Sequence, residues 1–330
     1  MQRHRSLATW GRSLDLPSPS ASLTSCRAKL TLCLGVALTA VLALPAFGPA
    51  FQANGKKAGH LTMGLVNIRA LTSDSADAEA NKANLQANLQ RHVYFIDKLA
   101  ADVDFVGFPE LSVNGYHFSK TMTWLKLDGP EVQALQKKAI EKGIYISVGL
   151  ALEDADGKRW NVQIVIDPQG RIIGLHRKLW LTAEKTYVEA GKLHEVFDVK
   201  GIKMGITICA DGTDRKNLEA LVKNGAQLIY GPHANTTGST IAGWYNFRKA
   251  WGGPDGWIAG LKVHAALHNH AALYNPEFDP PKDKAPPANW ASGAWFIGPD
   301  GRTLAQMPAS SQRADSKEFV LIHSVPIPGR

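Results

Sequence analysis

Three side chains with catalytic potential, Glu110, Lys178 and Cys209, each end or directly follow an apolar run. Such runs are typical of buried strands, and a side chain at a strand end lies at a sheet edge, where it is partly desolvated. A carboxylate in that position suits general-base work, an ammonium group can stabilise an oxyanion, and a thiol can act as a nucleophile. The three residue types together therefore favour nucleophilic catalysis.

Each of the three residues also has a structural interpretation that the sequence leaves open. Glu110 would otherwise be a solvated loop acid, and Lys178 part of a surface basic cluster. Cys209 would otherwise be a buried, inert thiol. A helix expected from about residue 214 would instead place Cys209 at a sharp strand-to-helix turn, where the helix dipole stabilises a thiolate.

The elements that must position these side chains alternate between strands and helices. Period-two and continuous apolar runs predict strands, and apolar residues at helical spacing predict helices. Hairpins interrupt the alternation, which indicates an α/β fold with mixed sheets. We expect strands at 61–68, 103–108, 144–152, 160–166, 171–178, 201–208, 226–231 and 318–325, a hairpin at 291–307, helices at 76–101, 131–143 and 214–224, and a helix or helix-to-strand segment at 261–275.

The N-terminal part of the chain has the pattern of a targeting segment. Residues 30–44 form a run of 15 uncharged residues that follows Arg27 and Lys29. This run is shorter than the ~20 residues of a membrane-spanning helix and fits the apolar region of a signal peptide. Small residues allow cleavage after Ala46 or Ala50. An uncleaved anchor is the alternative.

This interpretation divides the chain into residues 1–50, a signal peptide or membrane anchor with a basic leader, and residues 51–330, the catalytic part. We expect an exported protein, periplasmic or secreted, or one tethered to the membrane by residues 30–44. With 45% hydrophobic and 20% charged residues, the composition excludes a disordered chain. The net charge of +8 includes no Lys/Arg run longer than two, so no nucleic-acid partner is indicated.

Three motifs in order carry a family resemblance: FPELSVNGY (108–116), HRKLWLTAEKTYVEAG (176–191) and GITICADG (205–212). With these motifs, the chain resembles the nitrilase superfamily of carbon–nitrogen hydrolases over about residues 61–325. The resemblance implies an α-β-β-α sandwich, and makes residues 51–330 a carbon–nitrogen hydrolase domain.

The resemblance also implies a Glu-Lys-Cys triad. By motif position, Glu110 matches the general base, Lys178 the oxyanion lysine and Cys209 the nucleophile. The backbone N–H of Ala210 would join Lys178 in holding the oxyanion. The expected reaction releases ammonia or an amine from an amide and passes through a cysteine thioester.

Two further residues have positions that the family uses near the substrate. Glu184 matches a second glutamate beside the lysine, whereas Glu189, two residues before Gly191, has the wrong spacing for that role. Tyr116 matches the tyrosine that closes the first motif, and we expect it to pack in the site rather than to react.

The substrate class follows only from the resemblance. The sequence Cys-Ala-Asp at 209–211 is similar to the amidase branches, whereas true nitrilases usually have Cys-Trp-Glu. We therefore expect a small-molecule amide substrate, with a nitrilase or a catalytically silent binding protein as alternatives. The family implies a homodimer or higher oligomer and needs no cofactor or metal, so we expect His264, His268 and His270 to pack or to line the pocket.

Overall fold

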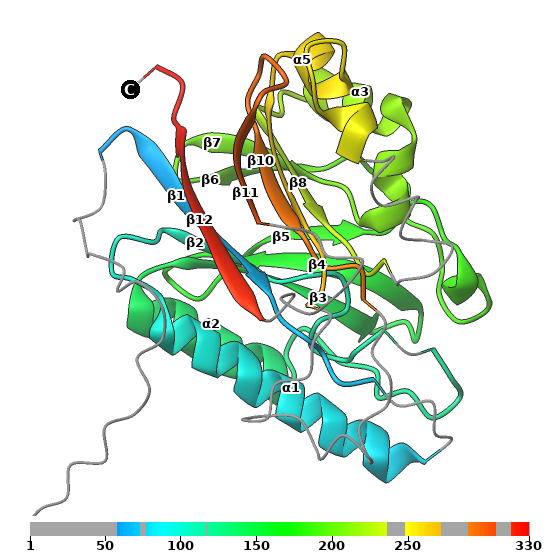
Figure 1. Cartoon of the computed structure of the whole chain (residues 1–330). Helices are drawn as coiled ribbons and strands as arrows, with labels where there is room; N and C mark the ends of the chain where they lie inside the picture. Colours follow the sequence, from blue (N-terminus) through cyan, green and yellow to red (C-terminus); the bar gives the residue numbers. More distant parts are fainter. Residues whose placement is uncertain are drawn as a thin grey trace, which may run out of the picture. The chain divides into compact units, whose positions relative to one another are not determined.

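Two six-stranded sheets make up the centre of the computed structural model (Figure 1). The structure describes residues 58–72, 77–116, 118–235, 248–271, 290–307 and 318–329. The expected targeting segment, residues 1–50, lies outside these ranges. Within the described ranges, no helix is both long and apolar enough to cross a membrane.

The first sheet has the strand order β12-β1-β2-β3-β4-β5. Strands β1, β2 and β3 are parallel, and the remaining neighbours pair antiparallel. Its strands are β1 (His60–Asn67), β2 (Phe105–Gly107), β3 (Tyr145–Glu153), β4 (Arg159–Ile166), β5 (Ile172–Arg177) and β12 (Phe319–Pro326).

The second sheet has the order β11-β10-β9-β8-β7-β6, with β7, β8 and β9 parallel. Its strands are β6 (Val196–Val199), β7 (Ile202–Ile206), β8 (Leu228–Pro232), β9 (His264–His268), β10 (Ala294–Ile297) and β11 (Thr303–Met307). Like the first sheet, it therefore has a parallel centre with antiparallel edges, which agrees with the mixed sheets expected from the hairpins.

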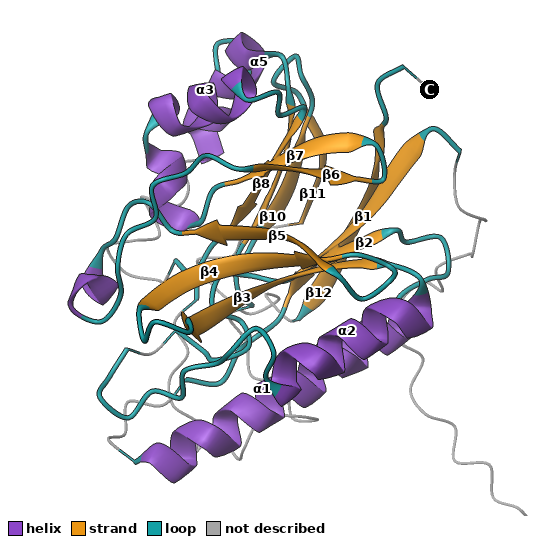
Figure 2. Cartoon of the chain, turned by 180° about the vertical axis from the view of Figure 1, so that it is seen from behind, coloured by secondary structure: helices purple, strands orange, loops and turns teal. Residues whose placement is uncertain are grey.

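Helices cover the outer face of each sheet (Figure 2). Helices α1 (Ala78–Lys98) and α2 (Pro130–Lys142) lie side by side on the first sheet, and α3 (Arg215–Lys223) and α5 (Trp257–Leu261) lie on the second. Local signals set the ends of these helices. The Asp77 side chain accepts hydrogen bonds from the first turn of α1, and α2 ends at Gly143, whose φ of 61° glycine adopts without strain.

Three apolar layers hold this arrangement together. The inner layer joins the two sheets through residues such as Met63 of β1, Met204 of β7 and Phe296 of β10. A second layer lies under α1 and α2, and a third under α3 and α5. Successive strand residues point to opposite faces, so each strand contributes to an inner and an outer layer. The expected α-β-β-α sandwich is confirmed.

The expected elements are present, with two differences. The segment at 261–275 is the end of α5 followed by β9, so the helix-to-strand interpretation holds for its described part. Strand β6 was not expected, because four residues with only one fully buried side chain give no clear alternation. It pairs antiparallel with β7 and so closes the edge of the second sheet.

Candidate active site

Glu110 lies in the tight turn after β2, and its side chain is fully buried. Leu111 has a φ of 51°, a left-handed conformation that is uncommon for a residue with a Cβ atom. The turn packs against Gly149 of β3, where a Cβ atom would lie 2.2 Å from the Leu111 nitrogen. The Glu110 carbonyl oxygen accepts a hydrogen bond from Nε2 of His270 at 2.8 Å. The backbone of Glu110 is therefore fixed on two sides.

Lys178 directly follows β5 and extends a buried side chain to two carboxylates. Its Nζ donates to Oε1 of Glu110 at 2.7 Å and to Oε1 of Glu184 at 2.5 Å. Asn161 of β4 also donates to Oε1 of Glu110, at 2.8 Å. Oε2 of Glu110 has no hydrogen-bond partner among the described residues and is buried. This oxygen is therefore the one left to exchange a proton.

Glu184 lies in the 3-10 helix η1 (Ala183–Thr186), in the loop after Lys178. Its Oε2 accepts hydrogen bonds from the Thr182 backbone N–H at 3.1 Å and from the Thr182 hydroxyl at 2.7 Å. The Tyr116 hydroxyl donates to the same oxygen at 3.2 Å. Tyr116 therefore contacts the site through a polar group as well as by packing. Glu189 is exposed and lies outside this cluster.

Burial and mutual attraction give the three charged groups distinct pKa values. Burial raises the pKa of Glu110, and the charge of Lys178 only partly opposes this. Burial would lower the pKa of Lys178, but the neighbouring acidic groups, Glu110 first among them, together outweigh it and hold that pKa well above its usual range. In Glu184, burial acts to raise the pKa, but the charge of Lys178 together with the hydrogen bonds from Lys178 and Thr182 lowers it to about 2. Glu110 is therefore the carboxylate best suited to carry a proton, and Glu184 the one that stays ionised.

Cys209 follows β7 by three residues and begins the 3-10 helix η2 (Cys209–Thr213). Its φ of 47° makes the sharp strand-to-helix turn expected for a nucleophile. Sγ lies 3.8 Å from Oδ1 of Asn235, which comes from the loop after β8. Ala210 follows within η2, and the first N–H groups of a helix have no intrahelical acceptor. The turn therefore directs a thiol and backbone N–H groups to one place.

Burial opposes the thiolate that a helix dipole would favour at Cys209. Burial, together with the charge of Glu110, raises the pKa of Cys209 to about 12, although Lys178 acts in the opposite direction. The helix dipole expected to favour a thiolate belongs to α3, which begins only at Arg215, while Cys209 begins a single short turn. Burial therefore favours the thiol form of Cys209, whose proton the adjacent Glu110 can accept.

Asp211 joins the lysine segment to the cysteine turn. Its buried Oδ1 accepts hydrogen bonds from the backbone N–H of Leu179 at 2.9 Å and of Trp180 at 2.7 Å. Its Oδ2 accepts one from the Ile208 N–H at 3.0 Å and lies 3.0 Å from Nε2 of His176. One carboxylate thus fixes the residues beside Lys178 to the residue before Cys209.

Sequence reasoning missed Asn161, Thr182, Asp211 and Asn235 as parts of the site. Asp211 belongs to the quoted cysteine motif, so its position was a signal that was available. The alternation of side chains along β4 indicates to which face of the sheet Asn161 points. It does not indicate which residue Asn161 contacts on that face. His268 and His270 are buried as expected, and His268 lies 2.8 Å from the Tyr230 hydroxyl.

The Gly- and Trp-rich segment 236–257 and the Pro-rich segment 275–289, which we expect to border the substrate pocket, lie mostly outside the described residues. This applies to 236–247 within the segment 236–257 and to all of 275–289. Chemically, the described part brings together a thiol, a buried carboxylate with a free oxygen and a buried ammonium group. Such a set can form and hydrolyse a thioester.

A family model described as "Carbon-nitrogen hydrolase" matches residues 66–250, more than half of the chain. A 2-oxoglutaramate amidase of Bacillus subtilis is 29% identical over 147 residues, 43% of this chain and 57% of that protein. A nitrilase of Pyrococcus abyssi is 33% identical over 134 residues, 38% of this chain and 50% of that protein. The chain thus spans about half the length of these curated relatives.

The fold also matches solved structures. Saccharomyces cerevisiae Nit3, described as a member of branch 10 of the nitrilase superfamily, superposes with a TM-score of 0.63 at 20% identity. The match covers 83% of this chain and 93% of Nit3. At this identity, the likeness concerns the sandwich and leaves the substrate open.

Proposed function

Because the chain belongs to the carbon–nitrogen hydrolase family, we propose that it hydrolyses a carbon–nitrogen bond of a small amide, other than a peptide bond. The observation that carries this proposal is the position of Lys178 Nζ between Glu110 and Glu184, in the cluster beside Cys209. A buried ammonium group held by two carboxylates is costly to maintain and is a functional arrangement when a nucleophile adjoins it.

In the first half of the reaction, Cys209 attacks the amide carbonyl carbon and the thiol proton moves to Oε2 of Glu110. Lys178 and the Ala210 N–H stabilise the oxyanion of the tetrahedral intermediate. The intermediate collapses to a thioester, the carbon–nitrogen bond breaks, and Glu110 returns its proton to the departing ammonia or amine.

In the second half, Glu110 removes a proton from water, which attacks the thioester carbon. The carbon–sulfur bond then breaks, the carboxylic acid leaves, and the proton held by Glu110 restores the Cys209 thiol. The high pKa of the thiol suits this cycle, because the same carboxylate takes and returns the proton in each half.

An amide is favoured over a nitrile by the residues beside Sγ. Ala210 is smaller than the tryptophan usual at this position in true nitrilases, and Oδ1 of Asn235 lies 3.8 Å from Sγ. An oxygen acceptor there suits the N–H groups of an amide, whereas a nitrile has none to donate. The similarity to a 2-oxoglutaramate amidase supports the same choice. The similarity to a nitrilase keeps nitrile hydrolysis as the second candidate.

The first experiment compares primary amides, N-carbamoyl amino acids and nitriles by ammonia release. We expect release from one of the amide classes and loss of nearly all turnover in Cys209→Ala. Faster release from nitriles would favour the second candidate. Absence of turnover with every class would instead favour a silent binding protein.

The second experiment separates the two glutamates. Glu110→Gln should reduce both turnover and the alkylation rate of Cys209 by iodoacetamide, by about 10²–10⁴-fold in turnover. Glu184→Gln should lose turnover while Cys209 remains reactive, because Glu184 holds Lys178 and transfers no proton. Glu318→Gln is the matched control, since Glu318 is also buried and ion-paired, with Arg91. Normal turnover in Glu184→Gln would contradict these assignments.

A further inference from the structure

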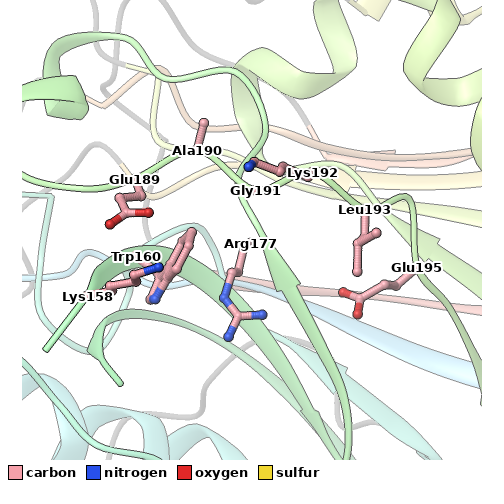
Figure 3. A pocket seen from close by; sticks show the side chains of 9 residues that line it. All are labelled: Lys158, Trp160, Arg177, Glu189, Ala190, Gly191, Lys192, Leu193 and Glu195. Atoms are coloured by element: carbon pink, nitrogen blue, oxygen red, sulfur yellow. The ribbon is translucent and has the colours of Figure 1, made fainter. Parts of the chain in front are cut away.

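A cavity of about 350 Å³ lies where β4 begins and β5 ends (Figure 3). Its volume is near the lower end of the ~300–1,000 Å³ that is usual for small-ligand sites. Trp160 and Arg177 form its floor, and the loop that contains Glu189, Lys192 and Glu195 forms its opposite side. None of these residues has a role in the proposed reaction.

The cavity and the active site lie on opposite faces of the same strand ends. Trp160 packs against the apolar layer under α1 and α2, which is the outer face of the first sheet. Its neighbour Asn161 donates to Glu110 on the inner face. Because successive strand residues point to opposite faces, Arg177 likewise points to the outer face and Lys178 to the inner face of the first sheet. A ligand in the cavity would therefore not occupy the space beside Cys209.

Arg177 lines this cavity and lies over the ring of Trp160. Its guanidinium carbon lies 4.7 Å from the centre of the Trp160 ring, so the ring holds the guanidinium plane. Its Nε is buried without a hydrogen-bond partner among the described residues. The terminal nitrogens of a guanidinium group held in this way can pair with the two oxygens of a carboxylate.

Glu195 provides the opposite charge in the same cavity. Figure 3 shows its carboxylate and the Arg177 guanidinium entering the cavity from different elements. Burial raises the pKa of Glu195, and His176 and Arg177 only partly oppose this, so the protein itself does not fully compensate the charge. Trp160 and Leu193 add apolar surface beside the two charges.

We propose that this cavity binds a small apolar amino acid as a zwitterion, with the ligand carboxylate on Arg177 and the ligand ammonium group beside Glu195. A simple anion would have to approach Glu189 and Glu195, and a simple cation would have to approach Arg177, Lys158 and Lys192. A zwitterion satisfies both signs, and its side chain would contact Trp160 and Leu193.

Isothermal titration calorimetry with L-leucine tests this site. We expect a dissociation constant on the order of 1 mM, which corresponds to about −4 kcal/mol. N-acetyl-L-leucine lacks the ammonium group and L-leucine methyl ester lacks the carboxylate, so each should bind at least about tenfold more weakly. Equal binding of either derivative, or no binding of L-leucine at 20-fold this concentration, would overturn the proposal.

Substitutions locate the binding. Arg177→Gln and Glu195→Gln should each weaken L-leucine binding about tenfold or more, with thermal melting used to verify that both variants fold. Arg302→Gln removes an exposed arginine far from this cavity in sequence and should have no effect. Cys209→Ala should also bind normally, because the active site lies on the other face. Parent-like binding by Arg177→Gln and Glu195→Gln, or loss of binding in Cys209→Ala, would refute the assignment.

Discussion

Replacing Asp211 by Asn should disconnect the lysine segment from the cysteine turn without removing any group that reacts. The Asp211 carboxylate accepts three backbone N–H groups and faces His176. An asparagine keeps one side-chain oxygen, which can still accept hydrogen bonds from the backbone N–H groups of Leu179 and Trp180. Its NH₂ group would then face the Ile208 N–H, and two donors cannot pair.

The expected loss of stability follows from that single mismatch. A buried N–H group that loses its acceptor costs about 1–3 kcal/mol, and the lost charge weakens the remaining hydrogen bonds. We therefore expect the free energy of unfolding to fall by about 2–4 kcal/mol. A displacement of about 1 Å between Lys178 and Cys209 would reduce kcat by about 10²-fold.

Urea unfolding and steady-state kinetics on the same preparations measure both effects. Asp167→Asn is the matched control, because Asp167 is also buried and accepts two backbone N–H groups, from Gln169 and Arg171, in the β4–β5 turn. It should lose stability and keep kcat. The reasoning is refuted if Asp211→Asn keeps parental kcat, or if Asp167→Asn loses as much activity.

Three further predictions concern other parts of the chain. Burial lowers the pKa of His92 to about 3, against 6.5 when unfolded, so protons bind the unfolded state preferentially and stability should fall as pH drops from 6.5 towards 3. The slope should be about 1.4 kcal/mol per pH unit for such a histidine, and urea titrations of His92→Gln should show a smaller one. Gly149→Ala should displace the Glu110 turn and cut kcat at least about tenfold, whereas Gly64→Ala, which meets only side chains, should not. We also propose export with cleavage, so N-terminal sequencing of protein from its host should begin near residue 47 or 51, and an intact N-terminus from the cytoplasm would contradict this.

The sequence predicted those site residues that a local pattern indicates. It did not predict contacts between residues that are far apart in the sequence. Glu110, Lys178 and Cys209 stand out because each follows an apolar strand, and strand ends meet at a sheet edge. The hydrogen bond from Asn161 to Glu110 spans 51 positions, and no local pattern indicates such a partner. The thiol pKa was also out of reach, because it depends on burial and on the Glu110 charge rather than on the turn itself.

The buried charged cluster has a consequence for the end of the proposed reaction. Two carboxylates, Glu110 and Glu184, surround one ammonium group, so the ionised cluster carries one excess negative charge. A neutral amide enters without electrostatic opposition. The acid that leaves becomes an anion at neutral pH, and like charges at short range repel strongly where water is excluded. The cluster would therefore expel its product, and inhibition by accumulated acid should be weak.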